Sequence, residues 1–340
     1  MNVPGFDNIK GQKLPIRLLQ TFLHDATLPH ALIFSGIAGI GKIAVAKTVA
    51  MALNCQKNSD GANPCGHCLP CRQIIADSHP DVLVIEPQGN YLRIDQIRKL
   101  LNTLALKPFT AGHRVVIISD SQAMNKEAAN ALLKALEEPP SNTIIILTTL
   151  QTSDLLPTIV SRCRKIRFNP LSSEDISSLL AETEEVDQRF IHTAAALSNG
   201  SLTKAKRLST TYWRQQRNWL IRSAGLNHSA NTGQRSVALA LAFAAQLSQK
   251  KEQITQLLEI LKTWIRDLSI WPYQPQSVIN TDYDEELALT RSNMDDGQLL
   301  CLWNAVEKAE KDIAAKANMR LTLDVMALSL AGYQPSELSE

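Results

Sequence analysis

The chain has 340 residues, of which 44% are hydrophobic, and its formal net charge is +2. This length exceeds what one ordinary core supports, so two or three domains are expected. A nearly neutral balance excludes tight binding to nucleic acid or to an anionic membrane through overall charge alone. The longest apolar run, Val237 to Ala245, is too short to cross a bilayer, and Met1 to Lys13 lacks the apolar core of a signal peptide. We therefore expect a cytoplasmic protein without a membrane partner.

A glycine-rich loop follows the first apolar run of the chain. It contains Gly36, Gly39, Gly41 and Lys42, and it has the strand, loop and helix context in which the pattern Gly-x-x-x-x-Gly-Lys binds phosphate. Its N–H groups and the next helix N-terminus would attract an anion, and the lysine would reach the terminal phosphates. The following residue normally gives a hydroxyl to Mg²⁺, but Ile43 has no oxygen to offer. The loop therefore keeps the shape of a nucleotide site and loses part of its chemistry.

An insertion at 54–78, rich in Asn, Cys, Gly and Pro, follows the helix after this loop. It holds four of the six cysteines, in the spacing Cys-x9-Cys-x2-Cys-x2-Cys: Cys55, Cys65, Cys68 and Cys71. Thiolates at this spacing can form a closed tetrahedral set, which predicts a structural zinc site without an open position for substrate. His67 could in principle replace one cysteine, and free or redox-active thiols are the alternative. Metal binding of roughly 10 to 16 kcal/mol would decide whether this polar insertion folds.

The first part of the chain alternates predicted strands with predicted helices. Strands are expected at 31–34, 82–85, 115–118 and 143–148, and helices at 14–24, 44–53, 94–104 and 126–138. Continuous β-branched strands between helices predict an α/β domain with a parallel sheet covered on both faces. Ligands of such a sheet bind at the carboxyl ends of the strands, where the glycine loop lies.

After Asn169-Pro170 the sequence carries only helical signals. We predict a P-loop domain at 1–169 that includes the cysteine module, a small helical lid domain at 170–208, and an all-helical domain at 209–340. The clearest amphipathic face of the last domain runs from Ile254 to Ile265. No catalytic constellation is seen there, and its paired carboxylates are interpreted as solvated helix starts.

Several motifs together resemble the bacterial clamp-loader subunits of DNA polymerase III, which are AAA+ proteins. They are the glycine loop, the cysteine module, His79-Pro80-Asp81, the stretch from Asn130 to Pro140, and Ser161-Arg162-Cys163. The resemblance is dense from residue 9 to about 205, and in the last third it rests mainly on helical content. It implies an AAA+ domain with a zinc insertion, a helical lid, and a helical collar through which the subunits assemble.

The resemblance also implies a role and partners. Such subunits form a hetero-pentamer with gamma/tau and delta subunits, which binds ATP between subunits and loads the sliding clamp onto primed DNA. In this family the arginine of Ser-Arg-Cys, here Arg162, reaches the γ-phosphate bound to the neighbouring subunit. An arginine supplied in this way is worth about 10³ to 10⁵ in rate for related enzymes. Without the flanking motifs, an ordinary surface ion pair would be the interpretation of Arg162.

Departures from the active pattern of the family indicate which kind of subunit this is. Active subunits place Asp-Glu after the third strand, where this chain has Ser119 and Asp120, and a second arginine in the lid, where it has Thr203. With Ile43, these losses fall in three separate elements. They predict a stationary subunit that completes a neighbour's ATP site without hydrolysing ATP. An active ATPase subunit and a zinc-dependent nucleic-acid-binding module are the alternatives, and nucleotide binding by the glycine loop is left open.

Overall fold

The computed structural model describes residues 5–57, 63–109, 112–183, 186, 188–224, 226 and 236–333. Contacts divide the chain into two compact units, Met1–Ile176 with Asn199–Lys204, and Ser177–Ser198 with Ala205–Glu340. We refer to them as unit 1 and unit 2 and describe each by itself. The predicted three-domain division stays a prediction. No described helix is both long enough and apolar enough to span a membrane.

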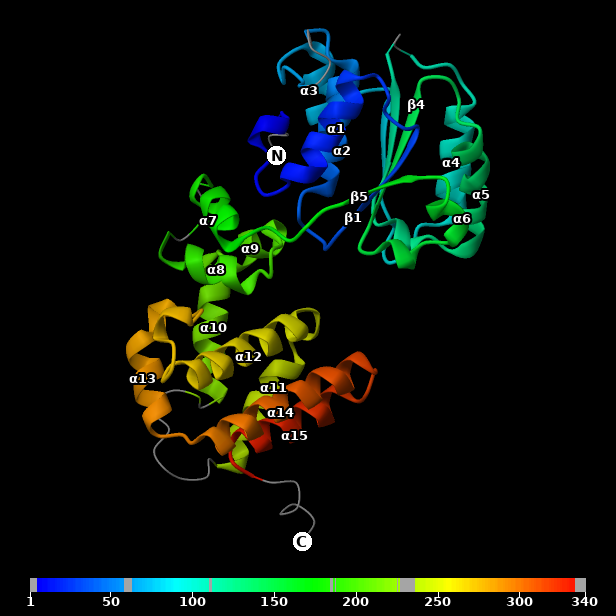
Figure 1. Ribbon diagram of the computed structural model, residues 1–340. Helices are drawn as coiled ribbons and strands as arrows, with labels where there is room; N and C mark the ends of the chain where they lie inside the picture. Colours follow the sequence, from blue (N-terminus) through cyan, green and yellow to red (C-terminus); the bar gives the residue numbers. More distant parts are fainter. Residues whose placement is uncertain are drawn as a thin grey trace. The chain divides into compact units, whose positions relative to one another are not determined.

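Unit 1 is built on a five-stranded parallel sheet in the order β2-β3-β4-β1-β5 (Figure 1). The strands are β1 (Ala31–Ser35), β2 (Val82–Ile85), β3 (Arg114–Ile118), β4 (Thr143–Thr149) and β5 (Arg164–Arg167). Strands β1, β3 and β4 are buried along their whole lengths, as expected for central strands covered on both faces. The predicted parallel sheet is confirmed, and β5 adds an edge strand that was not predicted.

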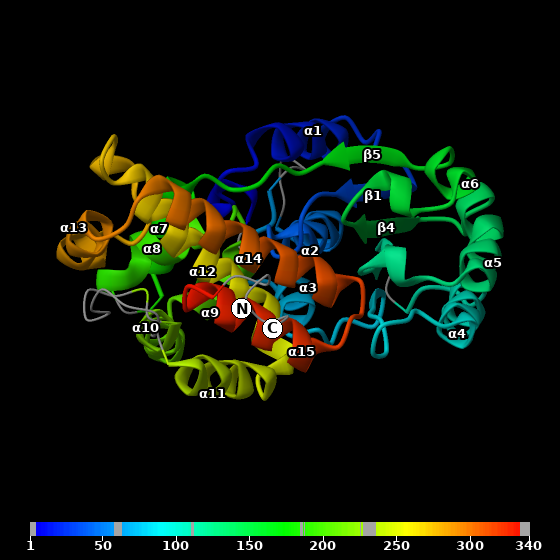
Figure 2. The same ribbon diagram turned by 90° about the horizontal axis from the view of Figure 1, so that it is seen from below.

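Helices cover both faces of this sheet (Figures 1 and 2). One face packs against helices α1 (Lys13–His24), α2 (Lys42–Asn54) and α3 (Leu69–Ile75), and the other against α4 (Ile94–Leu104), α5 (Lys126–Glu137) and α6 (Pro157–Val160). Successive strand residues point to opposite faces, so Ile146 joins the first core and Leu147 the second. All the helices predicted in this part are confirmed, whereas α3, inside the cysteine insertion, was not predicted.

The regular structure described in unit 2 is helical, as predicted. Its helices are α8 (Ile191–Leu197), α10 (Thr211–Ala224), α11 (Val237–Ser248), α12 (Ile254–Ile270), α13 (Asp284–Ser292), α14 (Asp296–Ala314) and α15 (Met319–Leu330). Two further helices, α7 (Ser173–Ala181) and α9 (Leu202–Leu208), contribute residues to both units. The predicted apolar face of α12 is confirmed, because Leu257, Leu261 and Ile265 are buried. The fold class therefore agrees with the expected α/β P-loop domain followed by helical segments.

Buried charges also hold unit 2 together. The guanidinium of Arg217, which is only 1% exposed, lies between the rings of Phe190 and Tyr283, at 4.5 and 4.7 Å from their centroids. It forms an ion pair with Asp282 and donates to the Asn280 side chain at 3.1 Å. This arginine connects the segment before α8 to α10 and to the connection before α13.

Candidate functional site

The glycine loop lies between β1 and α2, at the carboxyl end of the sheet. Gly39 has a φ of +77°, and a Cβ atom at this position would lie 2.4 Å from the Ser201 hydroxyl oxygen. The carbonyl of Gly39 accepts a hydrogen bond from the N–H of Thr203 at 3.2 Å. Only glycine fits here, since both the positive φ and the close approach exclude a side chain. The segment that carries Thr203 instead of the expected arginine is thus packed directly against the loop.

The lysine of the loop is bonded to the loop itself. The side chain of Lys42 is buried, and its ammonium donates to the carbonyls of Gly36, at 2.5 Å, and Ile37, at 2.8 Å. Burial lowers the pKa of Lys42, and the negative charge of Asp120 partly opposes this. The next residue, Ile43, lies in the first turn of α2 and has an apolar side chain at the position where a magnesium ligand would be needed.

The ends of β3 and β4 supply the other polar groups near the loop. Asp120 has a left-handed backbone, with φ at +45°, and its N–H donates to the Thr148 hydroxyl at 3.1 Å. Its carboxylate accepts a hydrogen bond from the Gln122 side chain at 3.2 Å. The buried Ser119 donates its hydroxyl to the Ile85 carbonyl at 3.4 Å. Of the groups that the active pattern would provide, Lys42 and one carboxylate, that of Asp120, are present, whereas Ile43 and Ser119 stand where the two magnesium ligands would be.

The structure brings the four cysteines of the insertion together, as their spacing predicted. The sulfur atoms of Cys55, Cys65, Cys68 and Cys71 all lie within 4.8 Å of one another. Cys55 follows the last residue of α2, and Cys68 precedes the first residue of α3, so the ends of two helices carry ligands. The N–H groups of Cys65 and Cys68 donate to the sulfurs of Cys55 and Cys65, each at 3.4 Å. His67 instead places its Nδ1 atom 2.6 Å from the Cys65 carbonyl.

The donor set of this cluster fits a thiophilic metal. Although burial by itself raises the pKa of Cys65, the backbone N–H groups of His67 and Cys68 lower it to about 6. Burial raises the pKa of Cys71, so without a metal this thiol would stay protonated. A bound Zn²⁺ favours the thiolate form and would hold four sulfurs at about 2.3 Å. The cluster can therefore hold zinc in a closed, structural site.

Arg162 lies just after α6 and reaches the last residue of α5. Its Nε donates to Glu137 Oε1 at 2.8 Å, and a terminal nitrogen forms an ion pair with the same carboxylate. Another terminal nitrogen donates to the Thr158 carbonyl at 2.9 Å. The surface ion pair considered as the alternative for Arg162 is therefore present in this structure. The neighbouring Cys163 is buried, which raises the pKa of its thiol to about 12.

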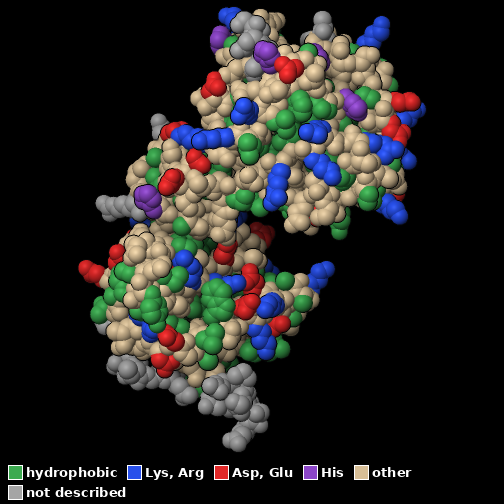
Figure 3. Space-filling view, in the orientation of Figure 1, with side chains coloured by type: hydrophobic (Ala, Val, Ile, Leu, Met, Phe, Trp, Pro, Cys, Tyr) green, Lys and Arg blue, Asp and Glu red, His purple; other side chains and the backbone are tan. Residues whose placement is uncertain are grey.

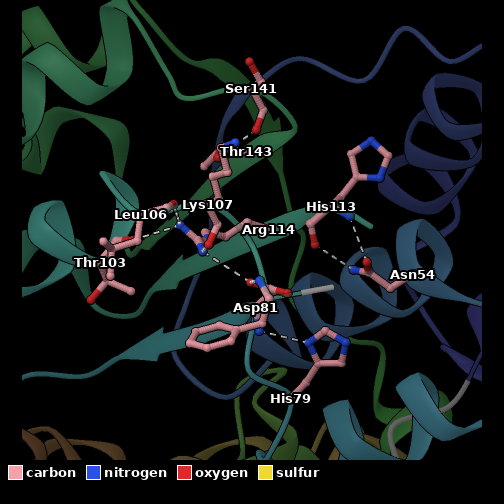
Figure 4. Close-up of polar contacts among 11 residues, drawn as sticks. Asn54, His79, Asp81, Thr103, Leu106, Lys107, His113, Arg114, Ser141 and Thr143 are labelled. Atoms are coloured by element: carbon pink, nitrogen blue, oxygen red, sulfur yellow. Dashed lines mark hydrogen bonds and ion pairs between the residues drawn. The ribbon is translucent and has the colours of Figure 1, made fainter. Parts of the chain in front are cut away.

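The motif His79-Pro80-Asp81 belongs to a buried network at the opposite ends of the strands (Figure 4). The carboxylate of Asp81 pairs with Arg114 at 3.3 Å and accepts the N–H of Phe109 at 3.0 Å. The Asp81 N–H donates to His79 Nδ1 at 3.2 Å. Burial lowers the pKa of His79, opposed in part by the charge of Asp81, which agrees with a neutral ring that accepts this bond.

Arg114 completes this network by donating to backbone carbonyls of the last turn of α4 and of the connection after it. The acceptors are Thr103 and Leu106, both at 2.9 Å, and Lys107 at 3.1 Å. Arg114 and Asp81 are 1% and 0% exposed, so this ion pair is fully desolvated. The sequence analysis did not predict this ion pair. The feature that could have indicated it is an arginine at the start of an otherwise apolar strand. The motif is thus structural, because it fastens the connection between α4 and β3.

Comparison with known proteins shows which sequences this chain resembles. The family model described as "DNA polymerase III, delta subunit" matches residues 11–172, which include the glycine loop, the cysteine cluster and Arg162. The "DNA polymerase III subunit delta'" of Pseudomonas aeruginosa is 38% identical over 191 residues, which cover 55% of this chain and 58% of that protein.

Two proteins of Bacillus subtilis and one solved structure are also similar to this chain. The delta' subunit of Bacillus subtilis is 34% identical over 184 residues, which are 54% of this chain and 55% of that protein. The tau subunit of the same species is 32% identical, over 59% of this chain and 36% of its own length. A solved gamma subunit-related protein of Thermotoga maritima is 17% identical, with a TM-score of 0.45, over 93% of this chain and 98% of that one. The chain thus matches just over half the length of its delta' relatives.

Proposed function

We propose that this chain is a delta-prime subunit of the DNA polymerase III clamp loader. In this role it would be a stationary member of a pentamer with gamma/tau and delta subunits, which loads the sliding clamp onto primed DNA. It would not hydrolyse ATP at its own glycine loop, and it would supply Arg162 to the ATP site of a neighbour. The similarity to delta' subunits from two species supports the type of subunit. The chemistry of the site supports the absence of hydrolysis.

The observation that carries the proposal is the state of the glycine loop. The ammonium of Lys42 is bonded to the carbonyls of Gly36 and Ile37, and a phosphate would have to compete with both bonds. Mg²⁺ requires oxygen ligands in nearly octahedral geometry, and Ile43 offers none. The hydroxyl of Ser119 is engaged with a backbone carbonyl. A loop of this kind would hold nucleotide weakly and would lack the metal that neutralises charge during phosphoryl transfer.

Two other features fit the proposed role. The guanidinium of Arg162 contacts Glu137 through two of its nitrogens, and this fork matches phosphate as well as carboxylate. Its side chain is 35% exposed, so a phosphate from another subunit could replace the carboxylate. The four sulfurs would hold Zn²⁺ in a closed set, which gives the metal a structural role and no part in catalysis.

An active ATPase subunit is the second candidate. It is favoured by the retained Lys42 and by the carboxylate of Asp120, whose charge acts on that lysine. A titration of the isolated chain with labelled ATP, with and without Mg²⁺, combined with an ATPase assay, distinguishes the two. We expect no hydrolysis above background and no effect of Mg²⁺ on nucleotide binding.

The informative variant for this experiment is Lys42→Ala. The matched control is Lys47→Ala, which removes a lysine from the same helix at a position that pairs with Asp77 on the surface. If the wild-type chain hydrolyses ATP, and Lys42→Ala abolishes this hydrolysis while Lys47→Ala does not, the active ATPase is correct and the proposal fails.

A further inference from the structure

The edge strand β5 carries a concentrated positive charge that the glycine loop and Arg162 do not explain. It pairs with β1 only, in the register that places Leu32 opposite Arg164 and Ser35 opposite Arg167. Of its four residues only Ile166 is buried, whereas Arg164, Lys165 and Arg167 are exposed. We call these three cations the β5 strip.

The cations of the β5 strip form no ion pair within the described parts of the chain. Throughout the described ranges, no hydrogen bond, ion pair or ring contact is formed by the side chains of Arg164, Lys165 or Arg167. Several other arginines do form ion pairs with aspartate or glutamate: Arg114, Arg162, Arg217, Arg266, Arg291 and Arg320. The strip thus places three unpaired cations within four residues of one exposed strand.

Neighbouring elements extend the positive surface. Helix α1 runs beside β5 (Figures 1 and 2), and Gln12, just before it, exchanges hydrogen bonds with the backbone of Asn169, just after β5, at 2.7 and 3.2 Å. On α1 the exposed Lys13 and Arg17 add two cations. Figure 3 shows Lys and Arg side chains gathered over the part of unit 1 where β5 crosses in Figure 1, with few acidic side chains among them.

Charged residues on an edge strand also have a purely protective use, because they discourage pairing with the edge of another sheet. One or two lysines would suffice for that purpose. Two of the three cations here are arginines, whose planar fork binds phosphate through two parallel hydrogen bonds. Lys165 and Arg167 are two residues apart, so their Cα atoms are separated by about 6.6 Å along one face of the strand, and Arg164 points to the other face. The strip therefore offers two phosphate contacts on one face of the strand and a third from its other face.

We propose that the β5 strip binds the phosphate backbone of a nucleic acid. The contact would be independent of base sequence, because it is made by flexible cations on an exposed edge and not by groups inserted in a groove. The inference goes beyond the proposed function, since it assigns to this chain a nucleic-acid contact of its own that requires neither nucleotide at the glycine loop nor a neighbouring subunit.

The test is fluorescence anisotropy of a short labelled DNA duplex of mixed sequence, titrated with the full chain at several salt concentrations. The variant Arg164→Gln with Lys165→Gln and Arg167→Gln should bind about tenfold or more weakly at low salt. Because each lost phosphate contact removes about 0.9 from the slope of log K against log salt, that slope should become shallower by about 2 to 3. Unchanged thermal unfolding would show that the variant is folded.

The matched control removes the same charge elsewhere, through Lys251→Gln, Lys308→Gln and Lys316→Gln, three exposed lysines that are distant in sequence. It should bind the duplex like the wild type. Equal weakening in both triple variants would assign binding to net charge alone and overturn the proposal. So would a wild-type chain that ignores the duplex, or that binds a polyglutamate peptide instead, which would indicate an acidic protein partner.

Discussion

At the residue scale, the buried arginine of unit 1, Arg114, has its charge paired with a carboxylate. Arg114 is satisfied by Asp81 and by three backbone carbonyls, although its Nε atom has no partner. A desolvated ion pair adds little net stability, but removing one partner leaves a buried charge uncompensated, at a cost of about 3 to 5 kcal/mol. His79 and Asp81 of the His79-Pro80-Asp81 motif therefore contribute to the fold of unit 1.

We predict that Asp81→Asn lowers the free energy of unfolding of unit 1 by about 3 to 5 kcal/mol, because Arg114 keeps its charge in a dry site. Urea unfolding followed by hydrogen exchange of the backbone of β3 and of the α4 to β3 connection measures this change. Glu307→Gln is the control, since it removes the exposed partner of Lys311 and should cost at most about 0.5 kcal/mol. Similar small losses in both variants would show that the buried pair is dispensable.

At the scale of elements, the cysteine cluster determines the local structure around it. Helix α3 has only seven residues, too few to be stable by itself, and its first turn follows directly on a ligand. Two of the four sulfurs are buried, and they belong to the same apolar core as α1 and α2. Metal binding would thus join the end of α2 to the start of α3.

We predict one bound zinc per chain in native mass spectrometry, lost in the variant Cys65→Ser with Cys68→Ser, together with part of the helical signal. Cys301→Ser, which changes an exposed cysteine of α14, is the matched control and should retain the metal. A metal-free wild-type chain, or disulfides among these cysteines in freshly reduced protein, would contradict a zinc site.

The elements that the sequence predicted well are those with strong local patterns. The runs that form β1 to β4 are mainly apolar, and those of β1, β3 and β4 are buried along their whole lengths. Strand β5 escaped prediction because Ile166 is its only buried residue, and its pairing with β1 depends on a partner far away in the sequence. Helix α3 escaped because it has only seven residues and lies within an insertion rich in Asn, Cys, Gly and Pro.

The same distinction applies to the site. The place of the glycine loop between a strand and a helix, and the closeness of the four cysteines, could be predicted because each set is local in sequence and its geometry follows from spacing. The contact of Thr203 with Gly39, the bonds of Lys42 to the loop carbonyls and the pairing of Arg162 with Glu137 depend on tertiary packing. These contacts decide what the loop and the arginine can do, and no local pattern shows them.

At the scale of the whole molecule, the proposed function is that of a subunit that has lost its own chemistry and acts on a neighbour. The most direct measurement is the DNA-stimulated ATPase rate of a reconstituted clamp loader that contains either the wild-type chain or Arg162→Ala. The control is Arg98→Ala, an exposed arginine of α4 paired only loosely with Asp95, at 4.0 Å. Assembly and zinc content should be unchanged in both variants. We predict that Arg162→Ala slows hydrolysis at the adjacent site by about 10³-fold or more, and so lowers the total rate in part, while Arg98→Ala leaves it unchanged. Equal rates with the wild-type chain and Arg162→Ala would contradict the account and leave Arg162 as the partner of Glu137 alone.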